Sequence, residues 1–198
     1  MILLHGYGSN GADLIAIGQQ WRAALPDTLF VAPNAPELCP GAPGGYQWWA
    51  LEGFSRQALA AGVARATPAL DAFIDKELAD AGLTDADLLL VGFSQGTMMA
   101  LHAGPRRAHP IAGIIGYSGM LADVAGLEGA TPSRPPVLLV HGTADQVVPF
   151  AAMGEAEAQL RRQGFDVRTH AAPGLGHGVD PTGLDLGLAF ARERLGSA

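Results

Sequence analysis

The residues most suggestive of chemistry lie in the pentapeptide Gly92-Phe93-Ser94-Gln95-Gly96, which has the pattern G-x-S-x-G. In this pattern a strand turns sharply into a helix and lifts the serine hydroxyl above the sheet, and the glycines remove side chains that would collide in the turn. The motif alone is weak evidence, because the chain has 27 glycines in 198 residues. An apolar run before the serine and a helical pattern after it strengthen the interpretation. We predict that Ser94 is a nucleophile rather than a serine that only starts a helix.

A nucleophilic serine needs a base, and histidine is the expected residue. Where such an elbow carries a triad, the chain order is Ser, then Asp or Glu, then His, which excludes His5. His177 lies in a glycine-rich loop after the last predicted strand, so its imidazole can reach over the strand ends toward Ser94. The other histidines fit less well: His102 in a helix, His109 in a charged turn, His141 at a strand end where a structural role is favoured, and His170 inside a strand.

The third member of the triad is an acid that orients the imidazole. Asp145 lies just past the carboxyl end of the apolar run 137–141, where catalytic groups gather in open α/β sheets. It would accept the imidazole N–H, select the tautomer and stabilise the imidazolium. Asp180 is the competitor, but it precedes Pro181 and fits better as the cap of the last helix.

An oxyanion requires two backbone donors near the serine. The N–H of Gln95, directly after the nucleophile, is one candidate. The N–H of Tyr7, in the glycine-rich loop after the first strand, is the other. An ordinary turn or a phosphate-binding loop is the alternative, but neither nucleotide-binding glycine pattern occurs there.

Short apolar runs alternate with longer helical patterns along the chain, which indicates a parallel sheet built by crossover helices, an α/β fold. The predicted strands are Ile2–Leu4, Thr28–Ala32, Asp87–Gly92, Ile111–Tyr117, Val137–His141 and Asp166–Ala171. The predicted helices are Ala12–Ala24, Gln57–Ala81, Gln95–Ala103, Ala151–Gln163 and Thr182–Leu195. The stretch Pro33–Phe54 has no periodicity, and loops of that length are usually functional. No repeat or second domain is evident, so residues 1–198 are expected to form one domain.

Composition limits the classes of function. The chain is 48% hydrophobic and 16% charged, which excludes a disordered protein. A net charge of −7 argues against nucleic acid as the main partner. The single cysteine, Cys39, cannot form an intramolecular disulfide, and its setting is poor for a nucleophile. With no signal peptide and no apolar run long enough for a membrane span, a cytoplasmic protein without stable membrane insertion is expected.

The ordered motifs together resemble one family. His-Gly-Tyr-Gly, Gly-Phe-Ser-Gln-Gly, Gly-Tyr-Ser-Gly, His-Gly-Thr-Ala-Asp-Gln-Val-Val-Pro and Gly-His-Gly span nearly the whole chain. This set is similar to the phospholipase/carboxylesterase family of α/β-hydrolases, relatives of the acyl-protein thioesterases. The resemblance implies an α/β-hydrolase fold, with a mostly parallel sheet and helices on both faces, and esterase activity without a metal or other cofactor. By position, it supports Ser94, Asp145 and His177 as the triad and Tyr7 and Gln95 as the oxyanion donors.

Two features depart from the family pattern. The chain begins inside the strand that ends in the His-Gly loop, so N-terminal strands are expected to be missing. Thr28–Ala32 would then be an exposed apolar edge, which suggests a truncated chain or a homodimer whose partner covers that edge. Thr97 stands where a smaller residue is common and is expected to crowd the helix against the sheet.

The substrate pocket is less well defined by the sequence. The segment between Tyr117 and Val137 is too short for a cap domain, so a shallow, open pocket is expected. Its predicted wall residues are Tyr46, Trp48 and Trp49, with Met120, Leu121 and Val148 nearby. The paired tryptophans could equally anchor the long loop to the core.

These observations predict a serine carboxylesterase that cleaves small esters by two-step acyl transfer. An acyl-thioesterase or a lysophospholipase shares every catalytic residue and is the alternative enzyme. A non-catalytic binding module on a hydrolase scaffold is the alternative from another class.

Overall fold

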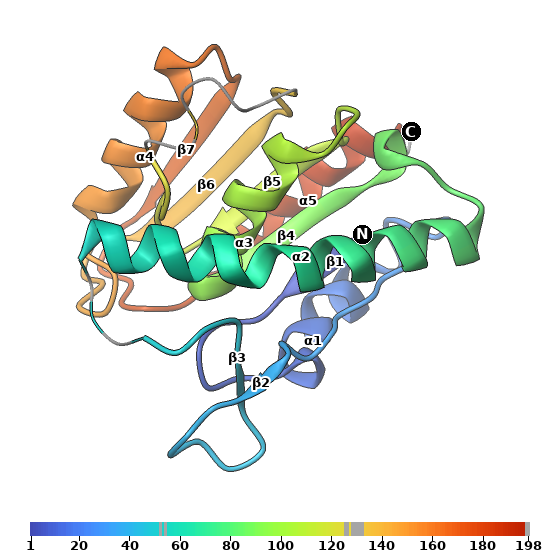
Figure 1. The fold of residues 1–198 in the computed structure, drawn as a ribbon. Coiled ribbons are helices and arrows are strands. Elements are labelled where there is room, and N and C mark those ends of the chain that lie inside the picture. The colour runs from blue at the N-terminus through green and yellow to red at the C-terminus, as the bar shows by residue number, and fades with distance from the viewer. Residues whose placement is uncertain (52, 54, 125–126, 128–132, 197–198) are drawn as a thin grey trace.

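The centre of the molecule is a five-stranded sheet in which all neighbouring strands are parallel, in the order β1-β4-β5-β6-β7 (Figure 1). This computed structural model describes residues 1–51, 53, 55–124, 127 and 133–196. The strands are β1 (Ile2–Leu4), β4 (Leu89–Phe93), β5 (Gly113–Tyr117), β6 (Val137–Gly142) and β7 (Val167–Ala172). The α/β fold predicted from the alternation of elements is confirmed.

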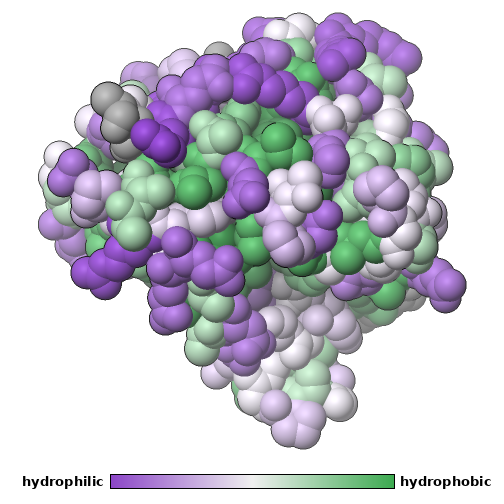
Figure 2. Space-filling model, turned by 180° about the vertical axis from the view of Figure 1, so that it is seen from behind, coloured by the Kyte–Doolittle hydropathy of each residue, from purple (hydrophilic) through white to green (hydrophobic). Residues whose placement is uncertain are grey.

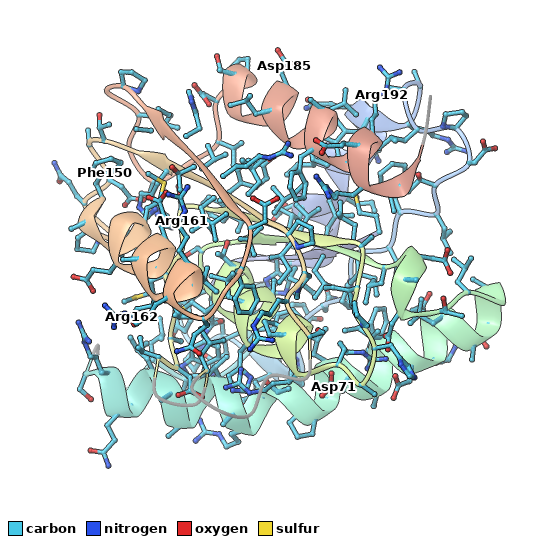
Figure 3. The ribbon with its side chains drawn as sticks, turned by 90° about the horizontal axis from the view of Figure 1, so that it is seen from above. Asp71, Phe150, Arg161, Arg162, Asp185 and Arg192 are labelled. Carbon is cyan, nitrogen blue, oxygen red and sulfur yellow. The ribbon has the colours of Figure 1, made fainter. Side chains whose placement is uncertain are left out.

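Helices cover both faces of the sheet. One layer holds α2 (Arg56–Ala81), α3 (Gln95–Ala103) and α4 (Ala151–Arg162); the other holds α1 (Gly11–Trp21) and α5 (Pro181–Leu195) (Figure 1). Figure 3 shows the two layers from above, with Asp185 and Arg192 pointing away from the sheet on α5. Asp180 caps α5 by accepting the Gly183 amide at 2.8 Å, as predicted.

Two buried clusters explain the continuous apolar runs. Leu89 and Val91 of β4 join the cluster under α1 and α5, whereas Leu90 joins the cluster under α2, α3 and α4. Successive strand residues point to opposite faces, so a strand covered on both sides must be apolar at every position. The three central strands β4, β5 and β6 are therefore buried along almost their whole length, and the turns at their carboxyl ends start from this buried layer.

The predicted strand Thr28–Ala32 is wrong. Val31 makes a single parallel bridge to Ile2, through Leu3 N to Val31 O at 2.8 Å and Val31 N to Met1 O at 3.0 Å. The ladder does not extend past this bridge, although β1 pairs with β4 along all three of its residues. The apolar run 28–32 lies against the edge of the sheet without becoming a strand.

The aperiodic stretch 33–54 contains a small hairpin that the sequence did not predict. β2 (Glu37–Leu38) and β3 (Tyr46–Gln47) pair antiparallel, and Phe54 is outside the described residues. Two-residue strands show no alternation, so no periodic signal exists for them. Tyr46 also exchanges backbone hydrogen bonds with the loop after β1, through Gly8 N and Ser9 O. The hairpin is thereby fastened beside the proposed oxyanion loop.

The face opposite to that of Figure 1 shows hydrophobic side chains between belts of hydrophilic ones (Figure 2). Among the described residues, no helix combines the length and the apolar character needed to cross a membrane.

Candidate active site

Ser94 lies in a sharp turn between β4 and α3, with φ 53° and ψ −115°. A non-glycine residue with positive φ is strained, and such strain is concentrated at functional sites. The flanking glycines permit the turn: a Cβ on Gly92 would lie 2.4 Å from Thr97 N, and one on Gly96 would lie 1.8 Å from Leu4 O. This arrangement has the geometry of a nucleophile elbow.

Thr97 does not crowd the helix against the sheet as expected. A Cβ on Gly116 would lie 2.6 Å from the Thr97 methyl group, and one on Gly119 would lie 2.3 Å from Thr97 Cβ. These two glycines provide the space that the threonine fills. The Thr97 hydroxyl donates to Tyr117 O at 2.9 Å, so it also joins the start of α3 to the end of β5.

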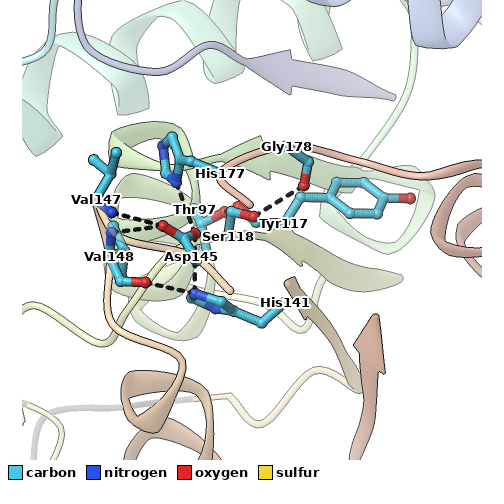
Figure 4. Close-up of polar contacts among 9 residues, drawn as sticks. All are labelled: Thr97, Tyr117, Ser118, His141, Asp145, Val147, Val148, His177 and Gly178. Atoms are coloured by element: carbon cyan, nitrogen blue, oxygen red, sulfur yellow. Dashed lines mark hydrogen bonds and ion pairs between the residues drawn. The ribbon is translucent and has the colours of Figure 1, made fainter. Parts of the chain in front are cut away.

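Asp145 lies in the turn after β6, and its side chain is completely buried. One carboxylate oxygen, Oδ1, accepts the amides of Val147 and Val148 at 2.9 Å each. The other, Oδ2, is 2.8 Å from His177 Nδ1 (Figure 4). Burial raises the pKa of Asp145, but the hydrogen bonds from His177, Val148 and Val147 outweigh it and hold the pKa below its ordinary value. The carboxylate is therefore ionised at neutral pH.

His177 lies in the loop between β7 and α5 and uses Nδ1 to contact the carboxylate. Since a carboxylate only accepts, Nδ1 carries the proton and Nε2 of the neutral ring is free to act as a base. The imidazole packs against the ring of Phe93, the residue before Ser94, with 4.9 Å between ring centroids. The structure thus brings Ser94, Asp145 and His177 to the carboxyl edge of the sheet.

Three contacts hold the histidine loop. The Ser118 hydroxyl donates to Gly178 O at 3.0 Å, from a buried position with φ 47° (Figure 4). Ala144 N donates to Leu175 O at 2.9 Å. A Cβ on Gly142 would lie 2.2 Å from that same carbonyl oxygen, so the loop passes directly over β6. Ser118 was not predicted as a functional residue, since only the tertiary structure places it beside residue 178.

The proposed oxyanion donors, the amides of Tyr7 and Gln95, lie in two segments that meet at Ser94. Gln95 N opens α3, and the loop of Tyr7 approaches the serine closely, since a Cβ on Gly6 would lie 3.2 Å from Ser94 Cβ. No acceptor within the described part of the chain takes either of these two N–H groups. Two unused donors beside a serine are what an oxyanion requires.

Trp48 and Trp49 lie in the core, at 3% and 2% exposure. The Trp48 indole donates to His5 O at 2.9 Å. The Gln95 side chain accepts from Trp48 N and donates to Trp49 O, both at 2.9 Å. This burial favours the alternative in which the tryptophans anchor the loop. Partly buried Tyr46 also packs against the core.

His5 and His102 have structural surroundings. His5 Nδ1 contacts Gly6 O at 2.7 Å and its Nε2 accepts Ala35 N at 2.9 Å, so both ring nitrogens are occupied. His102 contacts the Thr67 hydroxyl at 2.8 Å, and burial lowers the pKa of His102 to about 4. Neither reaches the elbow with a free nitrogen. Over the described residues, no group of three His, Cys, Asp or Glu is arranged to hold a metal ion.

A groove of about 190 Å³ opens between α2, α4 and the segment after β5. Its lining residues are Arg56, Leu59, Met120, Leu121, Ala122, Val124, Ala152, Glu155, Ala156, Ala158 and Gln159. Met120 follows Gly119, where a Cβ would lie 2.9 Å from the backbone carbonyl oxygen of Ser94, so this end of the groove lies close to the backbone of the elbow. Met120 and Leu121 were predicted at the pocket, whereas Val148 is buried in the Asp145 turn.

Comparisons with known proteins identify the family of this chain. Residues 1–192 match the model of the family described as Phospholipase/Carboxylesterase. The chain is 30% identical over 213 residues to acyl-protein thioesterase 1 of Neurospora crassa, covering 98% of this chain and 86% of that protein. It is 27% identical to esterase YpfH of Escherichia coli, covering 97% and 81%.

Solved structures are similar over the same length. The crystal structure of esterase PE8 has a TM-score of 0.94 and 49% identity, covering 98% of this chain and 91% of that one. SOBER1 of Arabidopsis thaliana has a TM-score of 0.86 and 25% identity, covering 98% and 97%.

Proposed function

Since the chain belongs to the phospholipase/carboxylesterase family and is a serine ester hydrolase, we propose that Ser94, His177 and Asp145 form its catalytic triad and that it cleaves short- to medium-chain carboxylic esters. The observation that carries this proposal is the Asp145–His177 contact of 2.8 Å at the edge where the strained Ser94 lies. The cytoplasmic location and the homodimer stay predictions from the sequence.

The reaction follows from these groups in two steps. His177 Nε2 takes the Ser94 proton as the hydroxyl oxygen attacks the ester carbonyl, and Asp145 stabilises the imidazolium that forms. The amides of Tyr7 and Gln95 donate to the oxyanion. The imidazolium then protonates the leaving alcohol, and the same residues activate water to release the acid from the acyl-enzyme.

The acyl chain of the substrate would occupy the groove that begins at Met120. Its apolar lining suits a hydrocarbon chain, and its small volume suits short to medium chains. Each buried methylene contributes about 0.8 kcal/mol, so the groove gives a preference over acetate that grows with chain length until the groove is full.

An activated serine can be tested directly by labelling. A fluorophosphonate probe should react stoichiometrically with the native protein at neutral pH, and peptide mapping should locate the adduct on Ser94. Heat-denatured protein is the control, because an unactivated serine does not react. Native protein that takes up no label would favour the non-catalytic binding module.

The groove is tested by Ala158→Trp, which places an indole on its exposed α4 wall. Loss of room for about two methylenes should lower the kcat/KM ratio of octanoyl to acetyl p-nitrophenyl ester about tenfold. Ala189→Trp is the matched control: the same change at an exposed position of α5, in the other helix layer. If the kcat/KM ratio is unchanged in Ala158→Trp, the acyl chain does not bind in this groove.

A thioesterase or lysophospholipase would use the same residues. The similarity to acyl-protein thioesterase 1 supports thioesters as the second class of substrate to test. Comparing p-nitrophenyl esters, acyl thioesters and lysophospholipid under one set of conditions ranks the three activities by kcat/KM.

A further inference from the structure

His141, predicted from the sequence to be structural, lies against the acid of the proposed triad. Its Nε2 is 3.2 Å from Asp145 Oδ2 and 2.9 Å from Val148 O (Figure 4). The oxygen that it approaches is the one that accepts from His177. The His141 side chain is 2% exposed. Asp145 is therefore enclosed by two imidazoles on one oxygen and two amides on the other.

The surroundings determine which His141 nitrogen carries the proton. A carbonyl oxygen only accepts, so Nε2 carries a hydrogen and donates it to Val148 O. The positive end of the same N–H group then faces Asp145 Oδ2. The ring has little freedom to turn away, because it is buried and Phe150 packs edge-on against it at 6.2 Å between centroids.

We infer that His141 is a positioning residue for the hydrolytic reaction, a role that rests on the proposed triad. It holds the turn from Asp145 to Val148 through its hydrogen bond to Val148 O. Its N–H also lies against Oδ2 of Asp145, which weakens the electrostatic attraction between that oxygen and His177. In the described part of the chain, the basic groups within 4 Å of this carboxylate are His141 from β6 and His177 from the loop after β7.

Removing the His141 N–H has two consequences. Oδ2 would face His177 alone and stabilise its imidazolium more strongly, so the acidic limb of the kcat/KM profile should move to higher pH. The turn would also lose its tie to β6, so the acid would orient the base less well and kcat should fall. A residue that only filled space would affect folding stability without moving the acidic limb.

The test compares His141→Met, which removes the donor, with His141→Gln, which keeps an N–H near the Nε2 position. For His141→Met we expect kcat to fall about tenfold, KM to change little, and the acidic limb to rise by about half a pH unit. His141→Gln should restore the limb to its wild-type position. His109→Met, on an exposed turn, is the control for loss of a histidine. The inference would be overturned if the acidic limb of the kcat/KM profile did not move in folded His141→Met. It would also be overturned if the limb moved equally in His141→Met and His141→Gln.

A second measurement needs no variant. Nitrogen-15 NMR of the histidine rings in the unmodified protein should show His141 protonated on Nε2 at neutral pH, whether or not the protein turns over an ester. A proton on Nδ1 alone would overturn the inference even if His141→Met failed to fold. An inactive wild-type protein would instead refute the proposed function and leave the tautomer result standing.

Discussion

Ser94→Ala is expected to lower kcat/KM for p-nitrophenyl acetate by about 10⁴-fold or more, since no acyl-enzyme can form without the hydroxyl. The fold should survive the change. The Ser94 side chain does not cap α3, and alanine places the same Cβ at the strained φ of 53°. The thermal unfolding midpoint should therefore stay close to that of the wild type.

Ser133→Ala provides the matched control for Ser94→Ala. Ser133 lies at the other end of the sheet, where its hydroxyl donates to Pro105 O at 3.4 Å, so its loss should leave turnover unchanged. Both variants are measured by initial rates and by differential scanning calorimetry. If Ser94→Ala keeps a tenth of the wild-type rate in a folded protein, Ser94 is not the nucleophile.

Asp145→Asn is expected to reduce kcat by about 10⁴-fold, although it changes a single atom. The amides of Val147 and Val148 require an oxygen at the Oδ1 position, so the new NH₂ group must occupy the Oδ2 position. There it would donate to His177 Nδ1, which forces the ring proton onto Nε2. That tautomer cannot accept the proton of Ser94. The same NH₂ would face the N–H of His141, donor against donor.

Asp185→Asn, on the exposed face of α5, controls for the loss of one negative charge (Figure 3). It should retain wild-type kcat. Circular dichroism separates a catalytic loss from unfolding, and burst kinetics show whether acylation is the step that fails. If kcat of folded Asp145→Asn decreases by less than about tenfold, another group orients His177.

The local part of this site is predictable from the sequence. Ser94 is marked by the glycines that its tight elbow requires. Asp145 follows β6, whose apolar run shows in the sequence, and His177 is marked by the glycine-rich loop after β7. Chain order and strand ends are enough to propose them. The helix cap at Asp180 is predictable for the same reason, because it depends on the next three residues.

Features built from distant segments are not predictable in this way. The groove joins Leu59, Met120 and Ala152, and no periodicity relates them. The tryptophans could not be assigned, because their burial depends on the Gln95 carboxamide and the His5 carbonyl. The segment 28–32 has strand character, yet it forms a single bridge to β1, which depends on how this segment approaches the sheet edge and not on its own residues. The meeting of His141 and Asp145 depends on how the turn after β6 folds back.

The main chain and the side chain of Gln95 have separate roles, and a substitution changes only the second. Its proposed oxyanion donor is a main-chain N–H, while its side chain holds the backbone of Trp48 and Trp49. Nineteen of the twenty amino acids supply that N–H equally, and only proline lacks it. The donor atom of the proposed oxyanion contact therefore remains after any substitution at positions 7 and 95 except proline. Substitutions are instead expected to be harmful at the Gln95 carboxamide and at the glycines around Ser94, groups that need not touch a substrate.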